Sequence, residues 1–202
     1  MGCAMSRRES MPLYLLARQS PPKKSLYPSL VGPQEEASRQ YKLQYHKYKT
    51  GFHYWTISSA SSELRLNILR PIDSCEMIFT DYANRNVLKL TLKEDKTTYV
   101  FSDPNNEAFV ASAHYCNKHN EKRIELRSRL DDAKSVTMIV EGDFFNGNLV
   151  VTNSRGQFIG LVVSNSVNVV HDQCSINIAP GADSLLVLAL VVIADELIQN
   201  RD

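Results

Sequence analysis

The sequence predicts a mainly β protein, a closed antiparallel barrel of about twelve strands that encloses a hydrophobic C-terminal helix. Two observations carry this prediction. From about Tyr41 onward, apolar and polar residues alternate in short runs, and helical periodicity is absent until the C-terminus. The chain then closes with an apolar run over residues 185–194 that has no polar side. One apolar face on every strand can line an interior, and a wholly apolar helix can fill it.

The alternation is clearest in residues 86–93, where the leucines face one way while the lysines and Thr91 face the other. Further alternating runs lie in residues 123–130, 136–140 and 174–178. Turn-forming residues separate these runs, at 94–96, 103–106, 146–147 and 154–156. Many short strands without intervening helices favour an antiparallel barrel or sandwich, and closure into a barrel also removes exposed sheet edges.

A helix over about residues 181–199 is expected after Pro180 and Gly181. Its apolar run would rise about 15 Å, against about 30 Å for the hydrocarbon core of a bilayer. The run is therefore too short to span a membrane, yet it is apolar on every side and must be surrounded by protein. A weak internal repeat also relates residues 78–90 to residues 150–161, about 72 positions apart, as a duplicated hairpin pair.

Composition divides the chain into residues 1–39, an acylated basic segment and linker expected to be disordered, and residues 40–202, the barrel domain. Residues 1–50 carry nine Lys/Arg against three Glu, whereas the rest of the chain is net acidic. A basic head suggests an anionic partner, either a membrane surface or nucleic acid. The four cysteines form no CxxC pair, which favours free thiols in a reducing, cytosolic compartment.

The N-terminal residues resemble a lipidation signal. Gly2 with Ser6 fits the pattern for N-myristoylation, and Cys3 is an adjacent thiol for palmitoylation. One myristoyl chain gives only marginal membrane binding, which a second chain or a basic patch makes durable. Arg7 and Arg8 begin such a patch. Ser10, directly after Arg7-Arg8-Glu9, is a candidate phosphorylation site whose added charge would weaken the attraction to acidic lipid.

No sequence motif identifies an enzyme or a metal site. The nucleophile elbow, the zinc-protease helix, the phosphate loop and the dinucleotide fingerprint are all missing. Cys174 follows His171-Asp172 but is in phase with Ile176 and Ile178, so a buried, inert thiol is expected. His114, Cys116 and His119 are expected to be ordinary strand and turn residues. We therefore expect no catalytic residues, no cofactor and no bound metal.

A basic stripe is the candidate binding site. It comprises residues on or beside one predicted strand: Lys118, Lys122, Arg123, Arg127 and Arg129. One interpretation is a solvated outer face. The other is a site for phosphorylated lipid headgroups, because guanidinium groups match phosphate oxygens. Nucleic acid is not expected as a partner, because aromatic residues are not interleaved with the stripe and the body is net acidic.

Three motifs together resemble the LURP-one-related family, which is grouped with the tubby C-terminal domains and the phospholipid scramblases. They are residues 141–145 (Glu-Gly-Asp-Phe-Phe), the strand-turn-strand through Gly156-Gln157, and residues 179–183 before an apolar helix ending in Ala194-Asp195-Glu196. The resemblance covers roughly residues 40–199 and implies a twelve-stranded barrel threaded by its C-terminal helix. It also implies a non-enzymatic protein. The acidic calcium segment of the scramblases is missing, so calcium dependence is not carried over.

The prediction is a monomeric, lipid-anchored protein on the cytoplasmic face of a membrane, in particular the plasma membrane. Its barrel would bind acidic, phosphoinositide-type headgroups or a protein partner. Two alternatives stay open. One is a scramblase-like lipid-transport factor whose C-terminal helix leaves the barrel, and the other is a lipid-anchored scaffold or regulator without lipid specificity.

Overall fold

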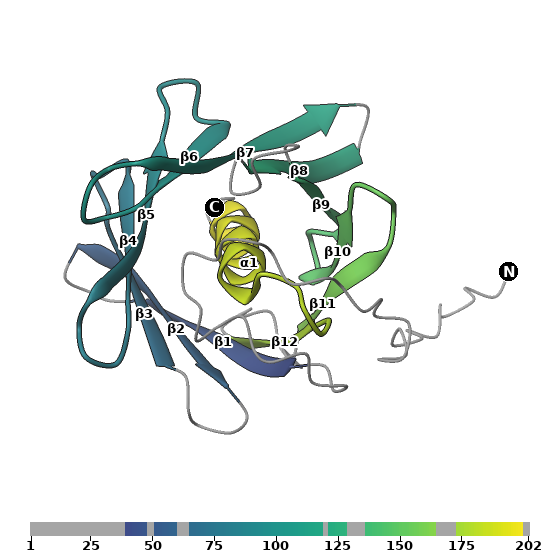
Figure 1. Cartoon of the computed structure of the whole chain (residues 1–202), viewed down its shortest axis with the longest axis horizontal. Coiled ribbons are helices and arrows are strands. Elements are labelled where there is room, and N and C mark those ends of the chain that lie inside the picture. The colour runs from purple at the N-terminus through teal and green to yellow at the C-terminus, as the bar shows by residue number, and fades with distance from the viewer. Residues whose placement is uncertain are drawn as a thin grey trace, which may run out of the picture.

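The computed structural model describes residues 39–47, 51–59, 65–118, 121–128, 136–164 and 173–199. These residues form a closed antiparallel barrel of twelve strands around a single helix (Figure 1). The strands are β1 (Arg39–Lys47), β2 (Phe52–Ser59), β3 (Arg65–Pro71), β4 (Glu76–Thr80), β5 (Asn86–Leu92), β6 (Thr98–Ser102), β7 (Phe109–Lys118), β8 (Glu121–Ser128), β9 (Val136–Asp143), β10 (Asn148–Asn153), β11 (Phe158–Ser164) and β12 (Gln173–Ile178). The helix is α1 (Ser184–Gln199).

The barrel has the simplest possible topology. Each strand pairs with the next along the chain, and β12 returns to pair with β1. Closure depends on the register that places Arg39 opposite Ile178 and Leu43 opposite Cys174. The predicted fold class is confirmed. No helix in the described part of the chain is long and apolar enough to cross a membrane.

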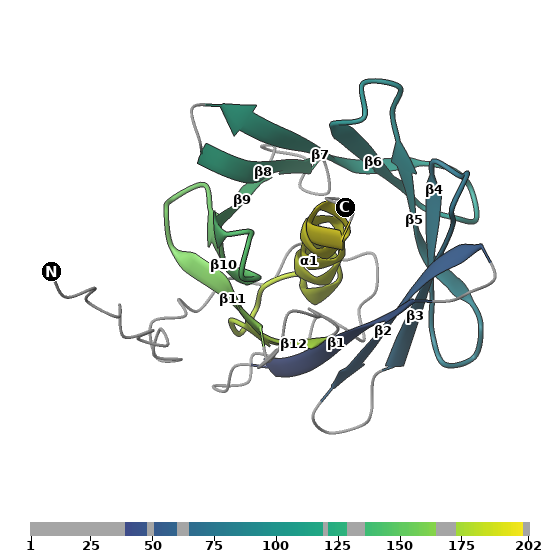
Figure 2. The ribbon, with the colours of Figure 1, turned by 180° about the vertical axis from the view of Figure 1, so that it is seen from behind.

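Helix α1 lies inside the ring of strands, as both views show (Figures 1 and 2). Twelve of its sixteen residues are buried, and every residue from Leu185 to Ala194 is at most 2% exposed. The helix begins at Ser184 rather than near residue 181. The delay has a local cause, because Gly181 adopts a positive φ of 78° in the preceding turn and Asp183 caps the helix.

The two halves of the barrel repeat one hairpin. Hairpins β4–β5 and β10–β11 lie six strands apart and begin their turns at Asp81 and Asn153. In each turn, a side-chain oxygen accepts hydrogen bonds from the backbone N–H groups two and four residues later. The residue three positions after the start of each turn has a positive φ, at Asn84 and Gly156. These shared details support the predicted duplication.

Gly160 lets the wall of the barrel approach the helix closely. A Cβ at this position would lie 3.0 Å from a methyl of Val151 and 3.2 Å from a methyl of Val187 on α1. Overpacking of this kind costs about 1–3 kcal/mol. We therefore expect Gly160→Ala to destabilise the domain by about that amount in urea denaturation. The double variant Gly160→Ala, Val151→Ala should recover part of the lost stability. If the effects of the two substitutions on the free energy of unfolding simply add, the clash is contradicted.

Asp183 caps α1 from a buried position. Its Oδ1 accepts hydrogen bonds from the backbone N–H groups of Leu185 at 3.1 Å and Leu186 at 3.3 Å, and its side chain is 4% exposed. Burial raises the pKa of the Asp183 carboxyl, and the two backbone hydrogen bonds oppose this shift. The cap is therefore geometrically sound but costly to ionise.

A variant pair can separate these two effects. An acid whose pKa is higher in the folded state stabilises the fold below its unfolded pKa and loses that stabilisation as pH rises through the folded value. Asn caps as well as Asp but carries no charge. Asp183→Asn should therefore gain stability relative to the native protein as the pH rises from acid to neutral in urea titrations. Asp183→Ala should lose about 0.5–2 kcal/mol at both pH values, because it removes the cap. If the free energy of unfolding of Asp183→Asn equals that of the native protein at both pH values, ionisation of Asp183 does not destabilise the fold.

Candidate functional site

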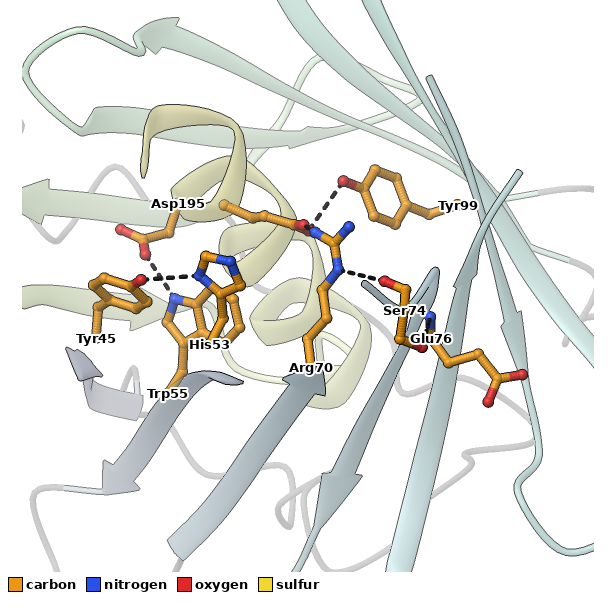
Figure 3. Close-up of polar contacts among 9 residues, drawn as sticks. Tyr45, His53, Trp55, Arg70, Ser74, Glu76, Tyr99 and Asp195 are labelled. Atoms are coloured by element: carbon orange, nitrogen blue, oxygen red, sulfur yellow. Dashed lines mark hydrogen bonds and ion pairs between the residues drawn. The ribbon is translucent and has the colours of Figure 1, made fainter. Parts of the chain in front are cut away.

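A polar cluster joins the C-terminal end of α1 to the barrel wall. The indole Nε1 of Trp55 on β2 donates a hydrogen bond of 2.7 Å to Oδ2 of Asp195 (Figure 3). The guanidinium of Arg70 on β3 forms an ion pair with Glu196, and the hydroxyl of Tyr99 on β6 donates a hydrogen bond of 3.0 Å to Glu196 Oε2. Three strands thus hold two neighbouring carboxylates of the helix.

Aromatic rings and a backbone carbonyl hold this polar cluster in place. Tyr45, His53 and Trp55 pack their rings together, with centroids 5.3 Å and 5.9 Å from Trp55, and the Tyr45 hydroxyl lies 2.9 Å from His53 Nδ1. Arg70 Nε donates to the carbonyl of Ser74 at 3.0 Å. Burial raises the pKa of the Tyr99 hydroxyl, an effect that the charge of Arg70 partly offsets.

The partners of this polar cluster indicate a structural role. Glu196 is only 1% exposed, and it is neutralised by Arg70 and satisfied by Tyr99. A buried charge is tolerated when it is paired and hydrogen-bonded in this way. The cluster fastens the last turns of α1 to β2, β3 and β6, and its carboxylates are directed at protein groups rather than at a ligand.

A small pocket lies beside the cluster, lined in part by Cys174, Asp195 and Val191. Its volume of about 20 Å³ is room for about one water molecule. Burial, and next the charge of Asp195, raise the pKa of the Cys174 thiol far above its ordinary value. Cys174 is 9% exposed and belongs to the core together with Ile176 and Ile178, which confirms the predicted buried thiol. Such a thiol is a poor nucleophile.

Three residues of the basic stripe, Lys122, Arg123 and Arg127, lie on β8, but their side chains do not all point the same way. Ile124 and Leu126 are buried inside the barrel, so Arg123 and Arg127 face outward, whereas Lys122 has the parity of the inward residues. Arg123 forms an ion pair of 2.7 Å with Glu125 and lies opposite Glu141 of β9.

Arg127 is the exposed cation of this face. Its cross-strand neighbours are Ser112 on β7 and Thr137 on β9, and among the described residues none forms an ion pair with it. The other predicted site residues lie outside the described part of the chain: Gly2, Cys3, Ser10, Arg129 and the side chain of Lys118.

His114 and Cys116 are the two candidate metal ligands on β7. His114 and Cys116 share the outer face, and His114 Nδ1 lies 3.1 Å from the hydroxyl of Thr98. His119 and His171 are outside the described residues. Within the described ranges, no three His, Cys, Asp or Glu side chains are grouped as a metal ion would require.

An apolar patch on the outer surface was not predicted. Phe52 on β2 pairs with Pro71 on β3, and Ile72 donates its backbone N–H to the carbonyl of Gly51 beside them. Phe52, Leu69 and Ile72 are 43%, 42% and 52% exposed. Sequence reasoning assigned apolar strand residues to the interior, and the out-of-phase positions of Leu69 and Phe52 were the available signal. The Trp55, Arg70 and Tyr99 partners of α1 were also missed, although two acidic residues ending a buried helix imply such partners.

A closed twelve-stranded barrel filled by its own C-terminal helix is the tubby-like architecture. The chain belongs to the LURP-one-related family, whose model matches residues 50–195. It is similar in fold to the X-ray structure of a protein from Arabidopsis thaliana, with a TM-score of 0.58 and 15% sequence identity over 83% of this chain and 97% of that one. No curated protein matches the chain significantly.

Proposed function

We propose that this protein is a membrane-tethered, non-enzymatic domain that binds acidic phospholipid headgroups at the cytoplasmic face of the plasma membrane. The observation that carries the proposal is the exposed guanidinium of Arg127 on a barrel whose interior is already filled. Because α1 occupies the interior of the barrel, a lipid headgroup would have to bind on the outer surface. There Arg127 can offer its donors to phosphate oxygens.

The tether would come from the N-terminal residues. Acylation of Gly2 and Cys3 would supply two chains, which is what durable anchoring requires. A single basic residue held near an anionic leaflet contributes about 1 kcal/mol, so Arg127 adds selectivity rather than the main affinity. Arg123, Lys118 and Arg129 would extend the contact, and phosphorylation of Ser10 would weaken it.

Liposome flotation of the unacylated full-length chain tests the headgroup proposal. Vesicles of neutral lipid are compared with vesicles that contain phosphatidylserine or a phosphoinositide. We expect Arg127→Gln to reduce binding to the acidic vesicles about fivefold, in line with about 1 kcal/mol per cation. Arg155→Gln is the matched control, because it removes the same charge from the exposed β10–β11 turn. Equal effects of the two substitutions, or no preference for acidic vesicles, would contradict a headgroup site at Arg127.

One observation favours a second candidate, a lipid-anchored scaffold. The apolar patch of Phe52, Leu69, Pro71 and Ile72 offers a surface suited to a protein partner. The scramblase-like alternative is less favoured, since α1 would have to leave the barrel and break its contacts with Trp55 and Arg70.

A further inference from the structure

The outer face of β10–β12 contains a leucine that is buried without belonging to the core. Leu161 is 7% exposed, yet it is excluded from the contiguous core cluster that its neighbour Val162 joins. The alternation explains why. Gly160 faces Val187 of α1 and Val162 is opposite Ile176, so both point inward and Leu161 points outward. A leucine on the outside of a closed barrel is buried only if something covers it.

Asn177 on the neighbouring strand is also buried although its side chain points out of the barrel. It is directly opposite Leu161, lies between the inward-facing Ile176 and Ile178, and is nevertheless 8% exposed. Its Oδ1 has no hydrogen-bond partner among the described residues. Burying a polar atom without a hydrogen-bond partner is unfavourable, so a donor is expected to approach it from outside. Leu161 and Asn177 together form a covered row across β11 and β12, hereafter the β11–β12 row.

No element that the structure describes lies over this row. The described residues consist of the barrel strands, their turns and α1, and both views place α1 inside (Figures 1 and 2). The chain before β1 arrives beside the row, because Gln40 is opposite Asn177 on the other side of β12. Residues 1–38 therefore enter next to the covered positions.

We propose that residues 26–31 (Leu-Tyr-Pro-Ser-Leu-Val) pack across the outer face of β11–β12, cover Leu161 and supply a donor to Asn177. The distances allow this. From Val31 to Arg39 the chain can span about 26 Å, whereas the row lies about two strand spacings, or about 10 Å, from β1. This segment is also the apolar stretch nearest to β1 in the preceding chain, and a short tether gives a high effective concentration.

Docking would hold part of the linker against the barrel. The tether between an acylated Gly2 and the barrel would then end near residue 26 instead of residue 39. The barrel would be held with its β11–β12 face toward the anchor. The inference does not depend on headgroup binding at Arg127, because it concerns a contact within the chain.

Cysteine labelling tests the contact in the full-length chain. Leu161→Cys is expected to react slowly with a maleimide, and serine substitution of Leu26, Leu30 and Val31 in the same chain should raise the rate tenfold or more. The matched control replaces Leu13, Leu15 and Leu16 with serine and should leave the rate unchanged. Peptide mass spectrometry separates this label from those on Cys75 and Cys116. Equal rates in the two serine variants, or rapid labelling without either, would overturn the proposal.

A photo-crosslinking residue at position 161 provides a readout that does not depend on rates. Cross-links to the peptide that contains residues 26–31 of the same molecule are expected. The control carries the cross-linker at Tyr82, which is 72% exposed in the β4–β5 turn, and should not reach that peptide. Cross-links only to residues 165–172, which join β11 to β12, or only to a second copy of the chain, would show that another segment covers the row and would overturn the proposal.

Discussion

Leu188→Asn is expected to abolish cooperative folding of the barrel. Leu188 lies in the middle of α1 and is 0% exposed, so its side chain is packed entirely within the core. Removing a buried leucine costs about 2–5 kcal/mol. The unpaired amide adds about 1–3 kcal/mol. The total approaches the entire stability of a typical domain, about 5–15 kcal/mol. Urea denaturation followed by tryptophan fluorescence should show no cooperative transition, since Trp55 reports on the interior.

Two controls keep this result specific. Leu188→Met conserves volume and should cost less than about 1.5 kcal/mol. Leu197→Asn introduces the same amide in the last turns of α1, at a partly buried position, and should leave a cooperative transition. A Leu188→Asn variant that unfolds cooperatively near the native midpoint would contradict the central role of α1. If Gly2 and Cys3 are acylated, the unfolded variant should still fractionate with membranes.

The barrel could be predicted because its construction is local. Each strand alternates with the period that a half-buried strand requires, as in β5, where Leu88 and Leu90 are buried and Lys89 between them is not. The completely apolar α1 then needed an enclosure, and only closure of the strands provides one. The exceptions are positions where hydrophobicity does not report the direction of the side chain. Leu69 and Leu161 are both apolar, but both point out of the barrel.

The contacts at the candidate site are set by register between distant strands, which a single sequence does not reveal. Trp55 and Asp195 are 140 residues apart, and Tyr99 and Glu196 are 97 residues apart. The outward direction of Arg123 and Arg127 followed from alternation along β8. Their electrostatic surroundings did not, because Glu141 reaches Arg123 only through the β8–β9 register. The side of the sheet to which a side chain points was thus predictable. The residues that lie next to it on neighbouring strands were not.

Arg70→Ala is expected to destabilise the domain by about 3–5 kcal/mol, the usual cost of leaving one member of a buried ion pair without its partner. Arg70 is 14% exposed and Glu196 is 1% exposed, so water cannot readily replace the lost guanidinium. The Tyr99 hydroxyl would be the remaining described donor to Glu196. Thermal and urea denaturation of the full-length chain measure the loss.

The matched control is Arg123→Ala, which breaks the Arg123–Glu125 pair on the outer surface. Its members are 43% and 21% exposed, and an exposed pair contributes about 0–1 kcal/mol. Both substitutions remove one arginine from a strand. The difference between their losses of stability therefore measures the effect of burial. Replacing both buried partners, as Arg70→Met with Glu196→Leu, should recover most of the stability lost in Arg70→Ala, since well-packed apolar side chains of similar volume often replace buried ion pairs at little cost. If Arg70→Ala cost no more than Arg123→Ala, the end of α1 would be held by packing and by Trp55 rather than by Glu196.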